Sequence, residues 1–172
     1  GGRYHYNDDW ETPDTQIINL EFPNNTLMTW EGRSCNGRSV EGGSVGVMFY
    51  GENGSMVIEG GNSYKVYDLN NKLLKEVNGS RKIGTGNLSN PSQDLDVLHI
   101  QNLFDAIRKG TTLNSDITGG HQSTLLVQLG NIALRSGSTL NIDSNNGRIL
   151  GNDAAMKYWR RDYAPGWESI LT

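Results

Sequence analysis

The sequence predicts an α+β fold in which helices pack on one face of a mostly antiparallel, open sheet. Three observations point to it: short alternating segments joined by tight turns fill the first half of the chain, residues 99–137 show helical periodicity, and a short strand and a final helix follow. Strands joined by so few residues pair antiparallel, because a parallel pair needs a crossover of about a dozen residues or more.

The strand segments are expected to form three hairpins. Residues 15–22 carry Ile18, Leu20 and Phe22 on one side and pair with residues 27–30 across PNNT. The other expected pairs are 45–50 with 55–59 around GENG, where Asn53 and Gly54 would take positive φ, and 64–67 with 73–77 around DLNNK. Before and after them we expect an edge strand running into an acidic loop at residues 1–13 and a mobile surface loop at residues 78–93.

Two amphipathic helices are expected between His99 and Gly137. Asp94 would cap the first helix and Gly110 would end it, whereas Thr118 or the glycine pair after it would start the second and Gly137 would end it. The apolar positions expected in the core are Ile100, Leu103, Phe104 and Ile107 in the first helix and Leu125, Leu126, Leu129, Ile132 and Ala133 in the second.

The end of the chain is expected to hold a short strand and a short helix. The strand covers residues 139–143 and runs into a turn at residues 145–147. Asp153 would cap the helix AAMKYWRR, which carries Met156, Trp159 and Tyr163 on roughly one side.

Length and charge restrict the class of protein. A chain of 172 residues predicts one domain, residues 1–172. The net charge of −4, with acidic and basic residues mixed along the chain, leaves no basic face for nucleic acid, and no apolar run reaches membrane-spanning length. The single Cys35 excludes an internal disulfide. The chain opens in mid-pattern with GGRYHY and no leader, so we expect a piece of a longer or processed protein.

Motifs for cofactor, metal or nucleophile chemistry are missing from the sequence. The glycines around Gly42 precede a strand instead of joining a strand to a helix, so we expect no nucleotide cofactor on this chain alone. The one cluster of metal-ligand types is expected to be a solvated acidic loop: His5, Asp8, Asp9, Glu11 and Asp14. We therefore predict no metal site, whereas a pair of carboxylates for glycosidase chemistry, Glu31 or Glu52 with Asp9, stays open.

The strongest candidate for binding is WEGRSCNGRS, residues 30–39. Trp30 offers a stacking face, Arg33 a fork of charged donors and Asn36 an amide, and together they suit a sugar or polyol. The alternative is an exposed turn with a surface pair between Arg33 and Glu31. His121, at an expected helix start, is a further candidate because the helix dipole favours a neutral imidazole there.

Several segments, in their order and spacing, resemble one family over essentially the whole chain. They are GGRYHYNDDWETPDTQ, TWEGRSCNG, FYGENGSMVIEG, HIQNLFDAIRKG, GGHQSTLLVQLGNIALRSG and RRDYAPGW. The sequence resembles the C-terminal domain of the Gfo/Idh/MocA oxidoreductases, named for glucose-fructose oxidoreductase and inositol dehydrogenase.

The resemblance implies that cofactor binding and substrate covering belong to two different domains. In that family an N-terminal Rossmann domain holds NAD or NADP and the catalytic lysine, and an Asp/His pair lies just before the segment that matches GGRY. This chain would then be the substrate-covering and oligomerisation domain of the full-length enzyme, with no catalytic residue of its own, inactive and free of cofactor by itself. The residues expected to contact a sugar, sugar derivative or cyclitol are Trp30, Arg33, Asn36, Tyr4 and His121. A homo-oligomer through the sheet is expected.

Two alternatives stay open from the sequence. The chain could be a non-catalytic interaction module whose sheet face pairs with a partner or a second copy through residues such as Ile18, Leu20, Val47, Phe49 and Val57. It could also belong to an NAD-dependent glycosidase, because some relatives run that reaction with the same parts. The substrate, the choice of NAD or NADP, and a cytoplasmic or exported location are left open.

Overall fold

The computed structural model describes residues 1–59, 63–78 and 93–167, with only the backbone of residues 93–96. The chain divides into two compact units, residues 1–98 and 99–172, and each is described by itself. The surface loop expected at residues 78–93 lies almost wholly outside the described residues.

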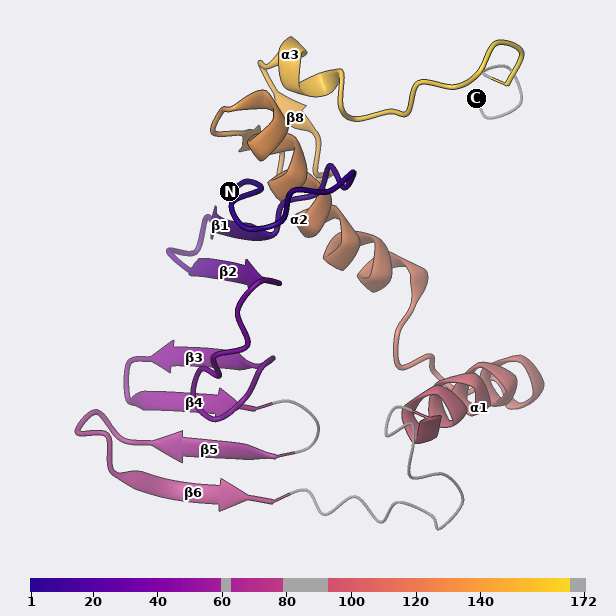
Figure 1. Ribbon diagram of the computed structural model, residues 1–172. Coiled ribbons are helices and arrows are strands. Elements are labelled where there is room, and N and C mark those ends of the chain that lie inside the picture. The colour runs from indigo at the N-terminus through magenta and orange to yellow at the C-terminus, as the bar shows by residue number, and fades with distance from the viewer. Residues whose placement is uncertain (60–62, 79–92, 168–172) are drawn as a thin grey trace. The chain divides into compact units, whose positions relative to one another are not determined.

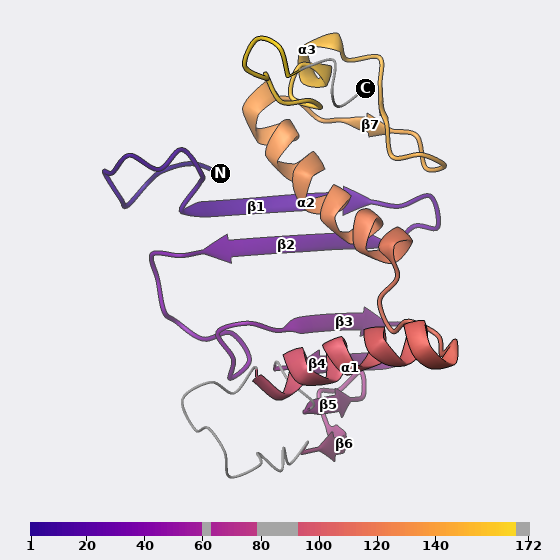
Figure 2. The ribbon, with the colours of Figure 1, turned by 90° about the vertical axis from the view of Figure 1, so that its right-hand side faces the viewer.

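The first sheet is the hairpin of β1 (Thr15–Glu21) and β2 (Leu27–Arg33) (Figures 1 and 2). The strands pair antiparallel from Thr15 opposite Arg33 to Glu21 opposite Leu27, so β2 continues three residues beyond the end expected from the sequence. Asn25 in the turn adopts φ +61°, a left-handed conformation that asparagine tolerates better than most residues. The predicted hairpin is confirmed, with a longer second strand.

The second sheet is a four-stranded antiparallel meander in the order β3-β4-β5-β6 (Figure 1). Its strands are β3 (Val47–Gly51), β4 (Gly54–Ile58), β5 (Tyr64–Tyr67) and β6 (Leu73–Val77). Gly54 takes φ +152°, and a Cβ there would collide with the carbonyl oxygen of Tyr67 on β5. Both hairpins around GENG and DLNNK are confirmed, although Gly54 has the positive φ expected there and Asn53 does not.

One face of the meander is apolar across β3, β4 and β5, and Lys75 on β6 lies opposite Val66 on that face. Val47 and Phe49 on β3 lie opposite Ile58 and Met56 on β4, and Val66 on β5 continues the row beside Met56. Val47 and Phe49 are 51% and 50% exposed. The other face carries Val57, which is the buried hydrophobic residue of this sheet at 4% exposure.

The helices are α1 (Gln93–Lys109) and α2 (Ile117–Ser136). Gly110 and Gly137 end them with φ of +69° and +61°, as the sequence predicts. The start of α2 differs from the prediction, because the carboxylate of Asp116, not Thr118 or the glycines, accepts from the N–H of Gly119 at 2.7 Å. Asp94 is likewise not a flanking cap, since α1 begins one residue before it.

The apolar stripe of α1 was expected in the core, whereas within the described residues of its own unit it is exposed. Its four members are between 46% and 72% exposed: Ile100, Leu103, Phe104 and Ile107. The spacing of these residues determines that they share one side of a helix, but a stripe is buried only where another element covers it.

The core of the second unit lies where α2 meets the C-terminal elements. These are β7 (Asn141–Ile142), β8 (Ile149–Leu150) and α3 (Asp153–Met156). Four residues form the buried cluster: Leu129, Ile132, Ile149 and Ala155. The predicted core positions Leu129 and Ile132 are confirmed.

The last helix begins differently from the prediction. The side chain of Asn152, rather than that of Asp153, caps α3 by accepting from the N–H of Ala155 at 2.9 Å. The helix is one turn long, and of its expected apolar side Met156 and Trp159 pack against the core while Tyr163 is 41% exposed.

The observed class is a mixture of helices and antiparallel sheets, in agreement with the coarse α+β prediction. The single open sheet expected from the sequence is instead divided, among the described residues, into β1-β2, β3-β4-β5-β6 and β7-β8. Short connections specify which neighbours pair, but they do not specify whether successive hairpins join edge to edge. Neither long helix of the described part has the length and apolar character needed to cross a membrane.

Candidate functional site

The N-terminal loop, residues 2–14, is built around the carboxylate of Asp14, which is 2% exposed. Its Oδ2 accepts hydrogen bonds from the backbone N–H groups of Tyr4, His5 and Tyr6 at 3.0, 2.9 and 3.1 Å. Its Oδ1 accepts from the hydroxyl of Thr15 at 2.9 Å. These bonds, first that of His5, hold the pKa of the Asp14 carboxyl well below its ordinary value, although burial works against them.

The prediction of a solvated acidic loop is therefore wrong for Asp14, which is buried. Asp8, Asp9 and Glu11 are exposed as expected, but Asp14 is a buried ion that organises the backbone around it. The edge strand expected at residues 1–13 is reduced to one bridge between Gly2 and Thr15. The expected strand does not form because the charged carboxylate of Asp14 accepts hydrogen bonds from three backbone N–H groups. These bonds favour a tight loop over an extended strand.

Arg3 secures the other side of the N-terminal loop. Its guanidinium donates to the carbonyl oxygens of Thr12 at 3.1 Å and Tyr6 at 3.4 Å and pairs with the carboxylate of Asp8. The same group lies 5.8 Å from the centre of the Tyr6 ring, where a cation and an aromatic face attract. Two charged side chains thus hold this loop, one through its N–H groups and one through its carbonyl groups.

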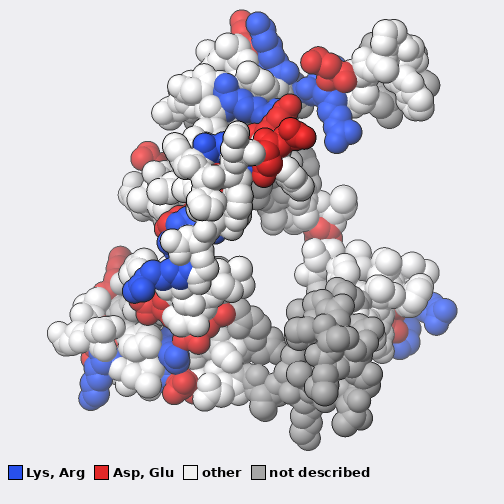
Figure 3. All heavy atoms as spheres, in the orientation of Figure 1, with Lys and Arg blue, Asp and Glu red and all other residues white. Residues whose placement is uncertain are grey.

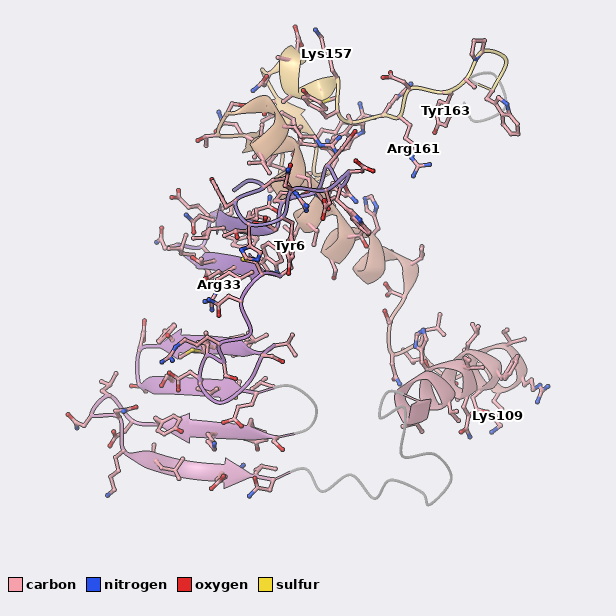
Figure 4. The ribbon with its side chains drawn as sticks, viewed as in Figure 1. Tyr6, Arg33, Lys109, Lys157, Arg161 and Tyr163 are labelled. Carbon is pink, nitrogen blue, oxygen red and sulfur yellow. The ribbon has the colours of Figure 1, made fainter. Side chains whose placement is uncertain are left out.

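Asp14 also joins the N-terminal loop to the end of β2. Its carbonyl oxygen accepts from both the N–H and the hydroxyl of Ser34, at 2.9 and 3.1 Å. The Tyr6 hydroxyl donates to the carbonyl oxygen of Ser34 at 3.4 Å. Figure 4 shows Tyr6 and Arg33 at this end of the hairpin. The structure therefore brings together two predicted segments, the one that carries Tyr4 and the one that carries Arg33 and Asn36.

Trp30 and Arg33 lie on opposite faces of the β1–β2 hairpin. Trp30 is opposite Ile18 and Arg33 is opposite Thr15, and an odd spacing along a strand reverses the face. The indole of Trp30 lies over Gly32, where a Cβ would collide with the ring, and it is 46% exposed. One flat wall containing both side chains is therefore not formed on this hairpin.

The charged and amide groups at the strand end already have local partners. Arg33 Nε lies 2.7 Å from Glu31 Oε1, the surface pair that the sequence left as the alternative. Asn36 Oδ1 accepts from the N–H of Arg38 at 2.9 Å, which closes a small turn. Because the pair is partly exposed, it adds little stability and a ligand can compete for it.

The two remaining candidates differ in setting. Tyr4 is 73% exposed, and its ring lies beside Gly2 while its N–H is held by Asp14. His121 is exposed on α2, five residues after the capping Asp116, and it belongs to the second unit.

Sequence reasoning missed the residues that build this region, namely Arg3, His5, Tyr6, Asp14 and Ser34. The one local signal that distinguishes Asp14 from the other carboxylates nearby is its position directly before an alternating strand. In the described part of the chain no group of three or more His, Cys, Asp or Glu side chains is placed to hold a metal ion.

The fold and these side chains define a mixed α and β protein with an organised aromatic loop at a hairpin end. Comparison of the chain with models of protein families, with curated proteins and with solved structures gives no match in any of the three.

Proposed function

We propose that this chain is the substrate-covering C-terminal domain of an NAD(P)-dependent oxidoreductase of the Gfo/Idh/MocA type that acts on a sugar, sugar derivative or cyclitol. The observation that carries the proposal is the junction at Asp14, where the carboxylate holds the Tyr4 segment and the carbonyl oxygen holds Ser34, next to Arg33. Tyr6 and Ser34 are 28 residues apart along the chain, and their meeting at one strand end supports a common role for the two segments.

The chemistry of the side chains agrees with a role in positioning. Hydride transfer needs the reacting C–H of the substrate held close to the nicotinamide with little freedom. Arg33 and Asn36 supply donors for hydroxyl groups, and Tyr4 supplies an exposed ring for the apolar face of a sugar. Trp30 lies on the opposite face of the hairpin from Arg33, so in this proposal the two side chains do not share one binding wall. The proton acceptor and the NAD(P) site belong to the proposed Rossmann partner.

Calorimetric titration of NAD(H) and NADP(H) tests the proposal. We expect binding to a version of the protein extended at its N-terminus to include the Rossmann domain and no binding to the 172-residue chain. Cofactor binding by the 172-residue chain alone would overturn the proposal that the NAD(P) site lies on a separate Rossmann domain. Failure of the extended protein to bind either cofactor would overturn the oxidoreductase assignment.

A glycosidase of the same family is distinguished by its products. If the extended protein with NAD cleaves a glycoside without accumulating NADH, the glycosidase alternative replaces the dehydrogenase, because its hydride returns to the substrate.

A second candidate function is that of an interaction module, and the apolar face of the meander favours it. Val47 and Phe49 expose about half of their surface there beside Met56, Ile58 and Val66. Exposed apolar rows on a sheet commonly pair with another surface. In the proposed oxidoreductase the same face forms the contact between copies, so the two candidates share this surface and differ in whether a cofactor is bound.

A further inference from the structure

Strong interactions hold the backbone of the N-terminal loop, although its aromatic side chains lie outside the core. A buried carboxylate and a guanidinium fix its backbone through hydrogen bonds to Tyr4, His5, Tyr6 and Thr12. The rings are nevertheless left outside: Tyr4 is 73% exposed, Trp10 71% and Tyr6 43%. Burial of these rings would stabilise the fold more than exposure, so their stabilising contribution to the first unit is small.

Exposed aromatic rings on a loop whose backbone is held by hydrogen bonds are well suited to binding. A ligand that stacks on them meets side chains whose backbone is already ordered, so less conformational entropy is lost on association. The ring of Tyr6 is additionally oriented by an edge-to-face contact with His5, with ring centres 4.8 Å apart, and by its hydroxyl bond to Ser34. The loop therefore has the properties of a preorganised recognition surface.

The negative charge of the loop favours uncharged ligands over anionic ones. Residues 1–14 hold four carboxylates and one guanidinium, and that guanidinium is paired with Asp8. Figure 3 shows carboxylates gathered at the N-terminal segment. Exposed Asp9 and Glu11 repel an anionic ligand and accept hydrogen bonds from hydroxyl groups. Aromatic faces with carboxylate acceptors match a ring that has apolar C–H faces and neutral hydroxyl edges.

We propose that the N-terminal loop binds an uncharged polyhydroxylated ring through Tyr4, Tyr6 and Trp10 and discriminates against phosphorylated or acidic sugars through Asp9 and Glu11. The inference rests on the proposed function, whose substrate class it narrows to neutral sugars or cyclitols.

Nuclear magnetic resonance titration of the full ¹⁵N-labelled chain tests the proposal, with the backbone amides of His5 and Tyr6 as reporters. D-Glucose or myo-inositol at millimolar concentration is expected to shift these amides, and D-glucose 6-phosphate is expected to bind roughly tenfold more weakly. Equal affinity for the phosphorylated sugar, or no shift with either neutral probe, would overturn it.

Three variants separate recognition from folding. Tyr4→Ala removes an exposed ring and keeps the backbone N–H on Asp14, so we expect a loss of affinity of about fivefold or more. Tyr50→Ala, which removes a tyrosine ring that is 79% exposed on β3, is the matched control and should leave affinity unchanged. The double variant Asp9→Asn with Glu11→Gln should reduce the discrimination against glucose 6-phosphate. Equal effects of Tyr4→Ala and Tyr50→Ala would remove the loop from the site.

The outcome is distinguishable from that of the proposed function. Ligand-induced shifts in the loop together with an extended protein that binds no NAD(P) would overturn the oxidoreductase and leave the loop site standing. An extended protein that binds cofactor and turns over a sugar, with Tyr4→Ala behaving like Tyr50→Ala, would overturn only the loop site.

Discussion

The backbone N–H of His5 lies 2.9 Å from Oδ2 of Asp14, and this hydrogen bond is the largest single cause of the lowered pKa of that carboxyl. Tyr4 and Tyr6 donate to the same oxygen on either side of it. Three successive N–H groups that converge on one point form an anion-binding nest, and here the chain's own carboxylate fills it. The backbone conformation of residues 4–6 therefore depends on the charge of Asp14.

The loop should loosen in acid. Because the pKa of Asp14 is lower in the folded protein than in the unfolded chain, the carboxylate stabilises the fold above its unfolded pKa, and that contribution declines as the pH falls below about 4. We expect the amide signals of His5 and Tyr6 to move toward unstructured values as the pH is lowered through this range and beyond. Asp14→Asn should show the loosened loop already at neutral pH, whereas Asp9→Asn, at an exposed position, should not. Amide signals that stay constant in acid would contradict the assignment of a charge-held loop.

The two faces of β3 should behave differently toward association. Phe49 is on the apolar face of the meander and Tyr50 on the other, and both are exposed, at 50% and 79%. If the apolar face joins two copies, Phe49→Asp should weaken the dimer by about thirtyfold or more, because it places a charge in the contact, while Tyr50→Asp should have little effect. Light scattering over a range of micromolar concentrations measures both. A wild-type chain that is monomeric throughout would exclude this interface.

The second unit should depend on α2 for its stability. Leu129 is 5% exposed among Ile132, Ile149 and Ala155, so Leu129→Ala should lower the free energy of unfolding by about 2–5 kcal/mol through the lost packing and the cavity left behind. Val127→Ala, at a site that is 52% exposed on the same helix, is expected to change it by no more than about 0.5 kcal/mol. Urea unfolding followed by circular dichroism provides the comparison, and similar midpoints for the two variants would argue against this core.

Asn152 should stabilise the chain end more than its neighbour Asp153 does. Its side chain accepts from the N–H of Ala155 and donates to the hydroxyl of Ser138 at 3.1 Å, which links α3 to the residues after α2. Asn152→Ala should cost about 1 kcal/mol in the unfolding experiment described above, the usual value of a helix cap. Asp153→Ala serves as the control and should cost less. The reverse order would restore Asp153 as the cap.

The positions of hairpins and helices could be predicted from the sequence because their signals are local. Asn25 and Gly54 provide turn conformations, and the glycines at 110 and 137 end helices, wherever the rest of the chain lies. The caps were misplaced by one or two residues since Asp116 and Thr118, like Asn152 and Asp153, are all good capping types. Only the direction of the side chain decides between them.

The candidate site was less predictable, because its geometry depends on partners far along the chain. From the residues alone, the second strand of this hairpin was expected over the apolar run at residues 27–30. Pairing with β1 extends the strand to Arg33 and so places Trp30 and Arg33 on different faces. The hypothesis that Trp30 and Arg33 form one wall holds only if the strand ends at Trp30, and it does not end there.

Local signals in the sequence specify the elements of this protein: hairpins, a meander, two long helices and the apolar residues on each. These follow from backbone preferences and from periods of two and of about 3.6 residues, which act over a few positions. Tertiary contacts, in contrast, bury Asp14 while Asp9 is exposed, and they place Leu129 in a core whereas Leu103 is 46% exposed. Burial and the hydrogen bonds of a charged group depend on which distant segments meet, and no local pattern encodes that meeting.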